Sequence, residues 1–140
     1  MSTRLKNKEE KLLKILTSLA EESMNGIPII VEGKKDFMAL RKLGVQGIII
    51  TVKTKGKSFL DTISEIQQTS ISEVILFLDF DKRGKEATRC LQQNLEHLKI
   101  RNNLTFWHEL SNLTSKEVQY IESLPVYLCN LRKRIITKRQ

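Results

Sequence analysis

Two apolar runs that end in acidic residues decide the fold class: residues 27–33 (IPIIVEG) and residues 74–84 (VILFLDFDKRG). Each run has the length and composition of a strand buried in a parallel sheet. The first run places Glu32 where its strand ends, and the second places Asp79 and Asp81 there. Because ligands bind at the carboxyl ends of parallel strands, we expect these three carboxylates to converge on one divalent cation. The pattern predicts a site that handles phosphate.

Helical and strand patterns alternate along the rest of the chain. They predict helices over residues 5–24, 36–43, 58–67, 84–98, 116–124 and 125–136, and strands over residues 27–31, 47–52, 74–78 and 104–107. Such alternation produces right-handed crossovers and a parallel sheet covered on both faces. The predicted fold class is α/β, with a central four-stranded parallel sheet flanked by helices. We expect an amphipathic N-terminal helix (1–26), a core (27–108) and a C-terminal helical segment with a basic tail (109–140).

The composition favours a polyanionic partner. The chain has 140 residues, 24 Lys and Arg against 16 Asp and Glu, and a net charge of +8. Such an excess of positive charge favours nucleic acid through the release of counterions. No apolar stretch approaches the roughly 20 residues that span a bilayer, and the N-terminus lacks the apolar segment of a signal peptide. We therefore expect a cytoplasmic protein without membrane segments.

Two other patterns are weaker. Cys90 and Cys129 lack the spacing of metal ligands and lie among apolar residues of helical pattern, which predicts reduced cysteines used in packing. Residues 56–58 (GKS) are similar to the end of a P-loop, but Thr51 stands where that motif requires glycine. The sequence therefore argues against a nucleoside triphosphatase, while a basic loop that contacts phosphate remains open.

The acidic signatures together resemble the Toprim domain. Glu32-Gly33 ends the first core strand, and Asp79 and Asp81, followed by Gly84, end the third. The resemblance covers about residues 28–107 and implies a Rossmann-like fold. Toprim domains supply the metal-binding catalytic domain of bacterial-type primases, of type IA and type II topoisomerases, and of several nucleases. The stretch at residues 31–36 (VEGKKD) is most similar to ribosomal RNA maturation nucleases and small stand-alone Toprim proteins.

The resemblance assigns catalytic and metal-binding roles to Glu32, Asp79 and Asp81, with Mg²⁺ or Mn²⁺ as the cofactor. Mg²⁺ is a hard ion that takes one or two carboxylates and keeps several waters, so the two aspartates suit it. Glu32 serves as general acid or base, or completes the metal shell. Gly33 and Gly84 are expected at backbone turns, where a side chain would obstruct a sharp bend or a phosphate.

Basic residues around these carboxylates are the candidate nucleic-acid contacts. They lie beside the acidic motifs, in one short loop and near the C-terminus: Lys34, Lys35, Lys53, Lys55, Lys57, Lys82, Arg83, Arg132, Lys133 and Arg134. For the C-terminal cluster, a solubilising tail is an equally good interpretation. Lys85 follows Gly84 at a position where topoisomerases and maturation nucleases of this class often carry an acid, which argues against a second metal site.

Two functions from different classes follow from these patterns. The first is a Mg²⁺-dependent nuclease-like protein that processes structured RNA, with RNA favoured over DNA. The second is a non-catalytic module that binds RNA or DNA and protects it or joins a larger complex. Protein partners or self-association are compatible with both. A structural flavodoxin-like domain with incidental acids ranks below them.

Overall fold

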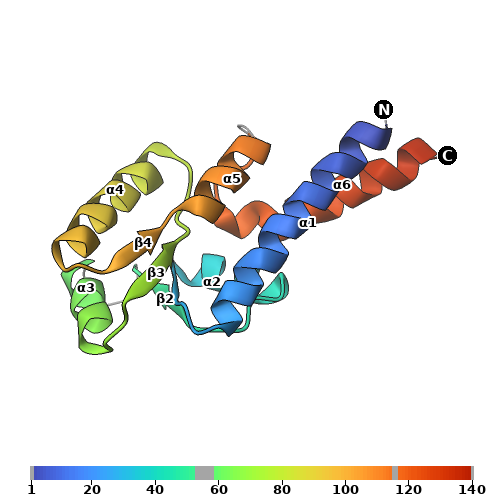
Figure 1. Ribbon diagram of the computed structural model, residues 1–140. Helices are drawn as coiled ribbons and strands as arrows, with labels where there is room; N and C mark the ends of the chain where they lie inside the picture. Colours follow the sequence, from blue (N-terminus) through green and yellow to red (C-terminus); the bar gives the residue numbers. More distant parts are fainter. Residues whose placement is uncertain (1, 53–58, 115–116, 140) are drawn as a thin grey trace.

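Four short strands form one parallel sheet in the computed structural model, which describes residues 2–52, 59–114 and 117–139 (Figure 1). The strands are β1 (Ile29–Val31), β2 (Ile49–Thr51), β3 (Glu73–Leu76) and β4 (Arg101–Asn103), and their order is β2-β1-β3-β4. In the central register, Ile30 of β1 pairs with Ile50 of β2 and with Leu76 of β3. The predicted four-stranded parallel sheet is confirmed.

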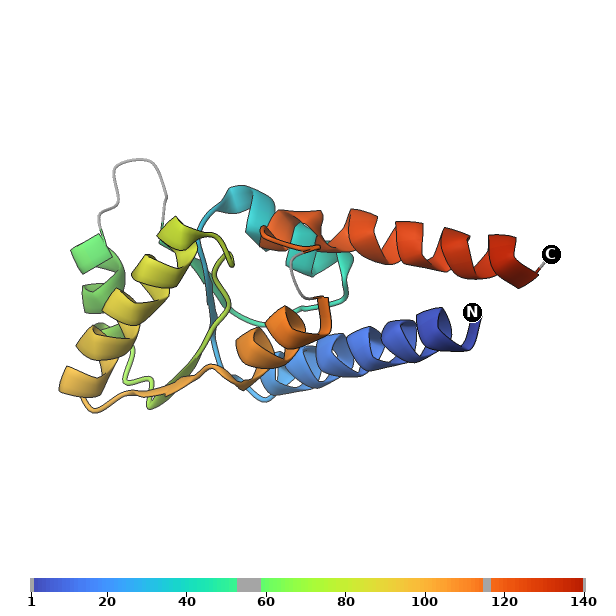
Figure 2. The ribbon, with the colours of Figure 1, turned by 90° about the horizontal axis from the view of Figure 1, so that it is seen from above.

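Helices cover both faces of the sheet. They are α1 (Ser2–Met24), α2 (Lys34–Lys42), α3 (Phe59–Gln68), α4 (Lys82–His97), α5 (Thr105–Thr114) and α6 (Leu124–Arg139), with a 3-10 turn η1 (Ile121–Ser123) before α6. Figure 2 shows α3 and α4 on one side of the sheet and the other helices on the opposite side. In the described ranges, no helix is both long and apolar enough to cross a membrane.

The two faces follow from the alternation of side chains along each strand. Ile29, Val31 and Ile75 point into the apolar cluster under α1, α2, α5 and α6. Ile30 and Leu76 point into the cluster under α3 and α4. Both sets are buried because a sheet residue and its neighbour face opposite sides. This is why the strands read as continuous apolar runs in the sequence.

The fourth strand differs from its prediction. It lies at Arg101–Asn103, and residues 105–107, expected as its end, begin α5 instead. Asn103 Oδ1 accepts a hydrogen bond of 2.8 Å from the backbone N–H of Thr105, an Asx turn that starts the helix. Phe106 and Leu110, four residues apart, are buried on the inner face of α5. A short apolar run does not distinguish a strand from a helix, and here the helix formed.

Residues 117–120 are not helical, so the helix predicted over residues 116–124 is wrong for its first part. Tyr120 has the extended backbone angles φ −124° and ψ 133°. Between residue 117 and the start of α6, only η1 is helical. The carbonyl oxygen of Gln119 accepts a 2.7 Å hydrogen bond from the backbone N–H of Phe80. This segment is therefore bonded to the loop after β3, and its backbone does not form the hydrogen bonds of a regular helix.

The two cysteines are free, as predicted, but both are exposed rather than packed. Cys90 precedes Leu91, which lies on the buried face of α4. Successive residues on a helix are turned by about 100°, so Cys90 faces outward. The apolar neighbours in the sequence therefore did not predict its exposure.

The outer halves of α1 and α6 form an antiparallel arm that carries both chain ends away from the sheet (Figures 1 and 2). Leu5 and Leu12 of α1 and Leu131 and Ile135 of α6 belong to one buried apolar cluster. The guanidinium Nε of Arg132 lies 3.0 Å from a carboxylate oxygen of Glu9, and Lys8 pairs with Glu117. The arm is thus an extension of the core rather than a separate tail.

Candidate metal centre

Three carboxylates meet at the carboxyl edge of the sheet. Glu32 directly follows β1, and Asp79 and Asp81 lie in the loop between β3 and α4. Because β1 and β3 are parallel neighbours, their carboxyl ends lie side by side. One oxygen atom from each of the three residues lies within 4.8 Å of the other two. The structure therefore brings together the three acidic residues that the sequence places at strand ends.

Asp36 is a fourth carboxylate at this edge, and the sequence patterns did not single it out. It lies in the first turn of α2, where only 6% of its surface is exposed. Its Oδ2 accepts a 3.0 Å hydrogen bond from the backbone N–H of Gly33, and the N–H of Glu122 also bonds to it. Burial raises the pKa of Asp36, and the negative charge of Glu32 adds to this effect. The sequence did contain a signal for Asp36, because an acidic residue three positions after the N-cap of a helix is typical of a capping box.

Asp79 lies among the negative charges of three other carboxyl groups. Burial raises the pKa of its carboxyl group to about 7, and the charges of Asp36, Glu32 and Asp81 contribute in the same direction. A hydrogen bond of 2.8 Å from the backbone N–H of Ile121 to Oδ1 acts against this rise. Neighbouring carboxylates repel one another unless protons or cations balance them. Without a cation, Asp79 reduces this repulsion by binding a proton. A divalent cation would compensate the negative charge instead.

Helix amino termini converge on the same carboxylates. The backbone N–H of Gly33, at the start of α2, bonds to Asp36, and that of Gly84, in the first turn of α4, donates a 2.8 Å bond to Asp81 Oδ1. The N–H of Ile121 begins η1, which leads into α6. The amino end of a helix carries partial positive charge and free N–H groups, so it stabilises carboxylates. Three such ends hold the acidic side chains in place.

The donor set fits a hard divalent cation. Mg²⁺ and Mn²⁺ prefer oxygen ligands, and all three members of the group offer carboxylate oxygens. Asp79 and Asp81 each use Oδ1 for a backbone hydrogen bond, so the second oxygen of each can serve a cation. Among the described residues this is the one group of acids, histidines or cysteines close enough together to hold a metal ion.

The two glycines expected at backbone turns serve different purposes. A Cβ atom on Gly84 would lie 2.2 Å from the carbonyl oxygen of Asp79 and 2.9 Å from Asp81 Oδ1. Gly84 therefore lets α4 pack directly against the acidic loop. Gly33 is the N-cap of α2, with a φ of −150°, which any residue can adopt. Gly33 contributes its backbone N–H, which bonds to Asp36, and does not need the conformational freedom of glycine.

The acidic loop, which joins β3 to α4 and carries Asp79 and Asp81, is also held by residues outside the strands. The indole N–H of Trp107 donates a 2.8 Å hydrogen bond to the carbonyl oxygen of Leu78. The ring of Phe80 stacks on that of Trp107 at 5.5 Å between centroids, and Gln119 accepts from the Phe80 N–H. These contacts give Trp107 a structural role in supporting the loop. The segments after β4 thus complete the site.

The predicted nucleic-acid contacts fall into separate regions. Lys34 and Lys35 at the start of α2, and Lys82 and Arg83 at the start of α4, are exposed beside the acidic cluster. Lys53, Lys55 and Lys57 lie outside the described residues. The C-terminal cluster (Arg132, Lys133 and Arg134) lies on the arm, and Figure 1 shows α6 leading away from the sheet. The structure therefore places the basic residues at the starts of α2 and α4 beside the carboxylates, and the C-terminal cluster away from them.

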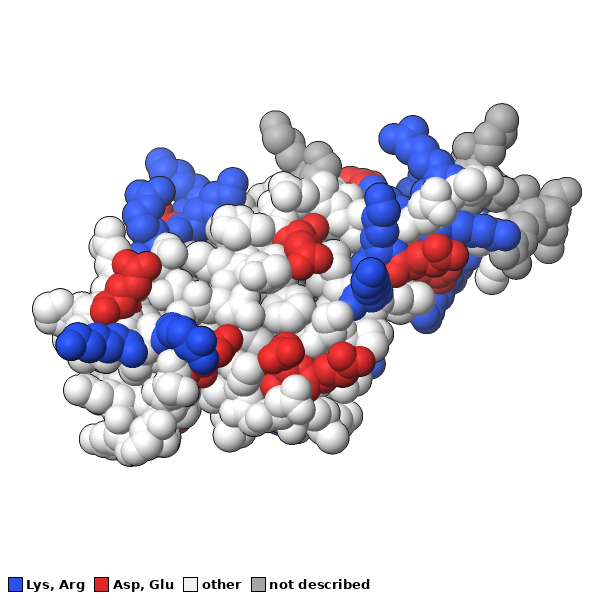
Figure 3. Space-filling model, in the orientation of Figure 1, with Lys and Arg blue, Asp and Glu red and all other residues white. Residues whose placement is uncertain are grey.

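A groove between α4 and α5 opens onto the acidic cluster. It has a volume of about 740 Å³, and Asp81 lines it as well as belonging to the carboxylate group. Lys85 and Arg89 of α4 also line it, and Figure 3 shows basic side chains gathered over the amino-terminal end of α4. The sequence patterns did not predict these two residues as contacts. The available signal was the spacing of Lys82, Lys85 and Arg89, which places them on one helix face.

Replacing Ile121 by proline is expected to weaken divalent-cation binding about tenfold. Proline removes the N–H that donates to Asp79, and such bonds to charged groups contribute about 1.5–3 kcal/mol. The extended backbone of Tyr120 and the position at the start of η1 both accept proline. Titration calorimetry with Mn²⁺ measures the effect. The matched control, Ile121→Val, also trims the buried side chain but keeps the N–H, and equal affinities of the two variants would contradict the assignment.

Together, the parallel sheet and the acidic group at its carboxyl edge define an α/β protein with a candidate site for a divalent cation. The family model for the Toprim domain matches residues 26–104 of the chain. The chain therefore belongs to the Toprim domain family. The matched range contains all four carboxylates, whereas η1, whose backbone N–H groups bond to Asp79 and Asp36, lies beyond it.

Curated relatives and one solved structure extend this comparison. The UPF0292 protein MJ1624 of Methanocaldococcus jannaschii is 38% identical over 120 residues, which are 85% of this chain and 91% of the relative. A UPF0292 protein of Methanosarcina acetivorans is 30% identical over 89% of this chain and 85% of its own length. A putative protein from Aquifex aeolicus shares the fold with a TM-score of 0.66 and 24% identity, covering 79% of this chain and 94% of that one.

Proposed function

We propose that this protein processes nucleic acid in a reaction that depends on a divalent cation, as a nuclease-like protein whose favoured substrate is RNA. The observation that carries the proposal is the approach of Glu32, Asp79 and Asp81 within 4.8 Å at the carboxyl edge of the sheet. Membership of the Toprim family supports phosphoryl chemistry at this edge. The net charge of +8 supports a polyanionic substrate.

In this proposal Asp79 and Asp81 hold Mg²⁺ or Mn²⁺, and Glu32 either completes the ligand set or transfers a proton. A bound divalent cation supplies polarisation of the phosphodiester and neutralises the charge that develops on it. Lys34, Lys35, Lys82 and Arg83 contact neighbouring phosphates from the first turns of α2 and α4. Asp36 positions the amino end of α2 and adds negative charge beside the ligands.

The deciding experiment compares a structured RNA with a DNA of the same sequence, each incubated with the protein with and without Mg²⁺ or Mn²⁺. We expect cleavage that requires the cation and proceeds faster on RNA. Cation binding is measured separately by titration calorimetry, so a failure to bind metal is distinguished from a failure to cut. Absence of cleavage with both cations, in a protein that binds them, would contradict a nuclease-like activity.

A second function is a metal-assisted module that binds nucleic acid without cutting it. Lys85 favours this alternative, because it lines the groove beside Asp81, and the topoisomerases and maturation nucleases that the chain resembles often carry an acid at this position. A lysine there provides a positive charge for a phosphate but no ligand for a second cation. This function predicts salt-sensitive binding without turnover in the same experiment.

A further inference from the structure

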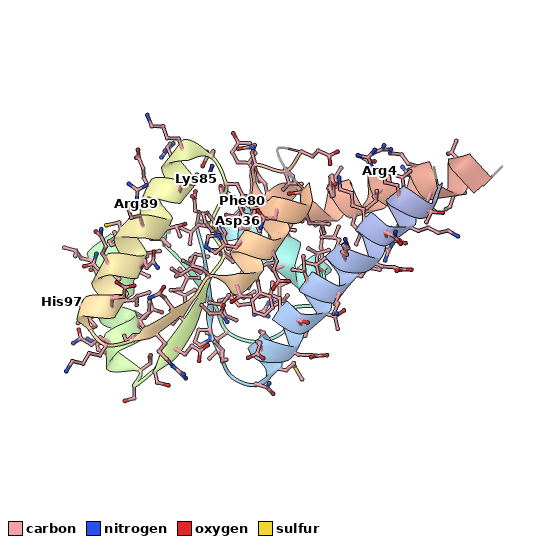
Figure 4. The ribbon with its side chains drawn as sticks, turned by 45° about the horizontal axis from the view of Figure 1, so that its top comes forward. Arg4, Asp36, Phe80, Lys85, Arg89 and His97 are labelled. Atoms are coloured by element: carbon pink, nitrogen blue, oxygen red, sulfur yellow. The ribbon has the colours of Figure 1, made fainter. Side chains whose placement is uncertain are left out.

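The groove between α4 and α5 has one basic wall and one neutral polar wall. Lys82, Lys85 and Arg89 line it from a single face of α4. Ser111 and Asn112 of α5 line the opposite side. Figure 4 shows Lys85 and Arg89 along α4, with Lys85 at the end of the helix near Phe80. Ammonium and guanidinium groups bind phosphates, whereas hydroxyl and amide groups bind sugars and bases.

The basic wall has spare positive charge. Within the described ranges, none of Lys82, Lys85 and Arg89 forms an ion pair, and all three side chains are exposed. The groove contains two carboxylates, Asp81 and Glu86. Asp81 belongs to the candidate metal centre, so a cation there would leave the groove positive. An anion that enters it gains attraction from the protein without displacing an internal partner.

A second groove continues the first across α5. Asn112 lines both grooves, and the second is lined further by Lys11 and Lys14 of α1. A third groove shares Lys11 and adds Arg4 and Lys8 of the same helix. Figure 3 shows basic side chains along α1 on the face that also presents the end of α4. The basic residues of α1 from Arg4 to Lys14 span about 15 Å at the helical rise of 1.5 Å per residue.

We propose that a single strand of nucleic acid leaves the metal centre through the α4–α5 groove and crosses α5 onto α1. Lys85 and Arg89 contact the phosphates nearest the carboxylates, and Lys14 and Lys11 contact phosphates further along the strand. The proposal rests on the proposed function and adds the path of the substrate to it. Its contacts lie mainly on residues outside the basic clusters that the sequence patterns singled out.

A groove of this kind suits a flexible single strand. Its volume of about 740 Å³ lies within the range of about 300–1,000 Å³ that accommodates a small organic ligand, and hence a nucleotide unit. Neutral polar groups on one wall face the side on which bases and sugars would lie. Successive grooves joined through Asn112 and Lys11 then extend the contact over several nucleotides.

The test measures affinity for a labelled single-stranded RNA of about 12 nucleotides between about 50 and 200 mM salt. One variant combines Lys85→Gln with Arg89→Gln, and another combines Lys11→Gln with Lys14→Gln. The control combines Lys42→Gln with Lys99→Gln, which removes the same charge from exposed residues outside the three grooves. Circular dichroism confirms that each variant is folded.

We expect each groove variant to bind at least about tenfold more weakly and to lose about 1.4 from the slope of log affinity against log salt, since each lost phosphate contact removes about 0.7. The control is expected to keep the slope of the wild-type protein. Unchanged slopes in the groove variants, or an equal loss in the control, would overturn the path and leave the proposed function standing. A wild-type protein that binds no nucleic acid would overturn both.

Discussion

Asp79→Asn is expected to lose cation-dependent cleavage of RNA by at least about 100-fold and to lose most of its affinity for Mn²⁺. Even the outer partners of metal ligands change affinity or activity by about 10–100-fold when removed, and a ligand itself contributes more. Asparagine keeps an oxygen for the Ile121 N–H but removes the charge that a cation would balance. Calorimetry and a single-turnover cleavage assay measure the two effects.

The same variant is expected to remain folded and to have a Tm no lower than that of the metal-free wild-type protein. Asp79 is surrounded by the negative charges of Asp36, Glu32 and Asp81, so neutralising it relieves repulsion. Glu96→Gln is the matched control, because it removes one carboxylate from the exposed far end of α4. If Asp79→Asn bound Mn²⁺ with the affinity of the wild-type protein, Asp79 would not be a ligand of the metal centre. If Glu96→Gln lost as much Mn²⁺ affinity, the loss would be a general effect of charge.

Gly84→Ala is expected to destabilise the protein by about 1–2 kcal/mol and to abolish cation binding. Alanine would favour the helix by about 1 kcal/mol, but its Cβ would lie 2.2 Å from the Asp79 carbonyl oxygen and 2.7 Å from the carbonyl carbon. Overpacking of this kind costs about 1–3 kcal/mol and sometimes more, and here backbone rather than a flexible side chain must move. Denaturant unfolding and Mn²⁺ titration measure the two effects.

Gly44→Ala provides the comparison for Gly84→Ala. Gly44 has a φ of +96°, and a Cβ added there meets nothing within 4 Å. Alanine at this position is strained by about 1–2 kcal/mol, which lowers stability without touching the acidic loop. We therefore expect Gly44→Ala to bind Mn²⁺ as the wild-type protein does. Loss of cation binding in both variants would show that lower stability, rather than displacement of Asp79, explains the result.

The sequence predicted the sheet and its acidic edge because both depend on local patterns. Ile29 and Ile30 face opposite sides of a sheet covered by helices, so the strand is apolar throughout. Glu32, Asp79 and Asp81 follow such strands directly, and parallel pairing alone brings strand ends together. These features need no knowledge of which distant segments meet.

Local patterns failed where two interpretations had similar propensity. Residues 104–107 (LTFW) contain the β-branched and aromatic residues typical of strands, yet most of them form the first turn of α5. The choice was made by burial of Phe106 and Leu110 on one helix face and by the Asn103 turn before them. Tertiary packing commonly overrides propensity in short segments.

By itself, the sequence determined an α/β fold with Glu32, Asp79 and Asp81 at the ends of parallel strands, because strand periodicity and chain order specify which residues reach that edge. Only the tertiary structure decided that Asp36 joins them, that Ile121 and Gln119 hold the acidic loop, and that Lys85 and Arg89 face a groove beside it. These relationships join segments tens of residues apart through backbone hydrogen bonds and helix packing. Local spacing indicates a capping acid at Asp36 and one helix face for Lys85 and Arg89, but it does not indicate which distant segments they meet.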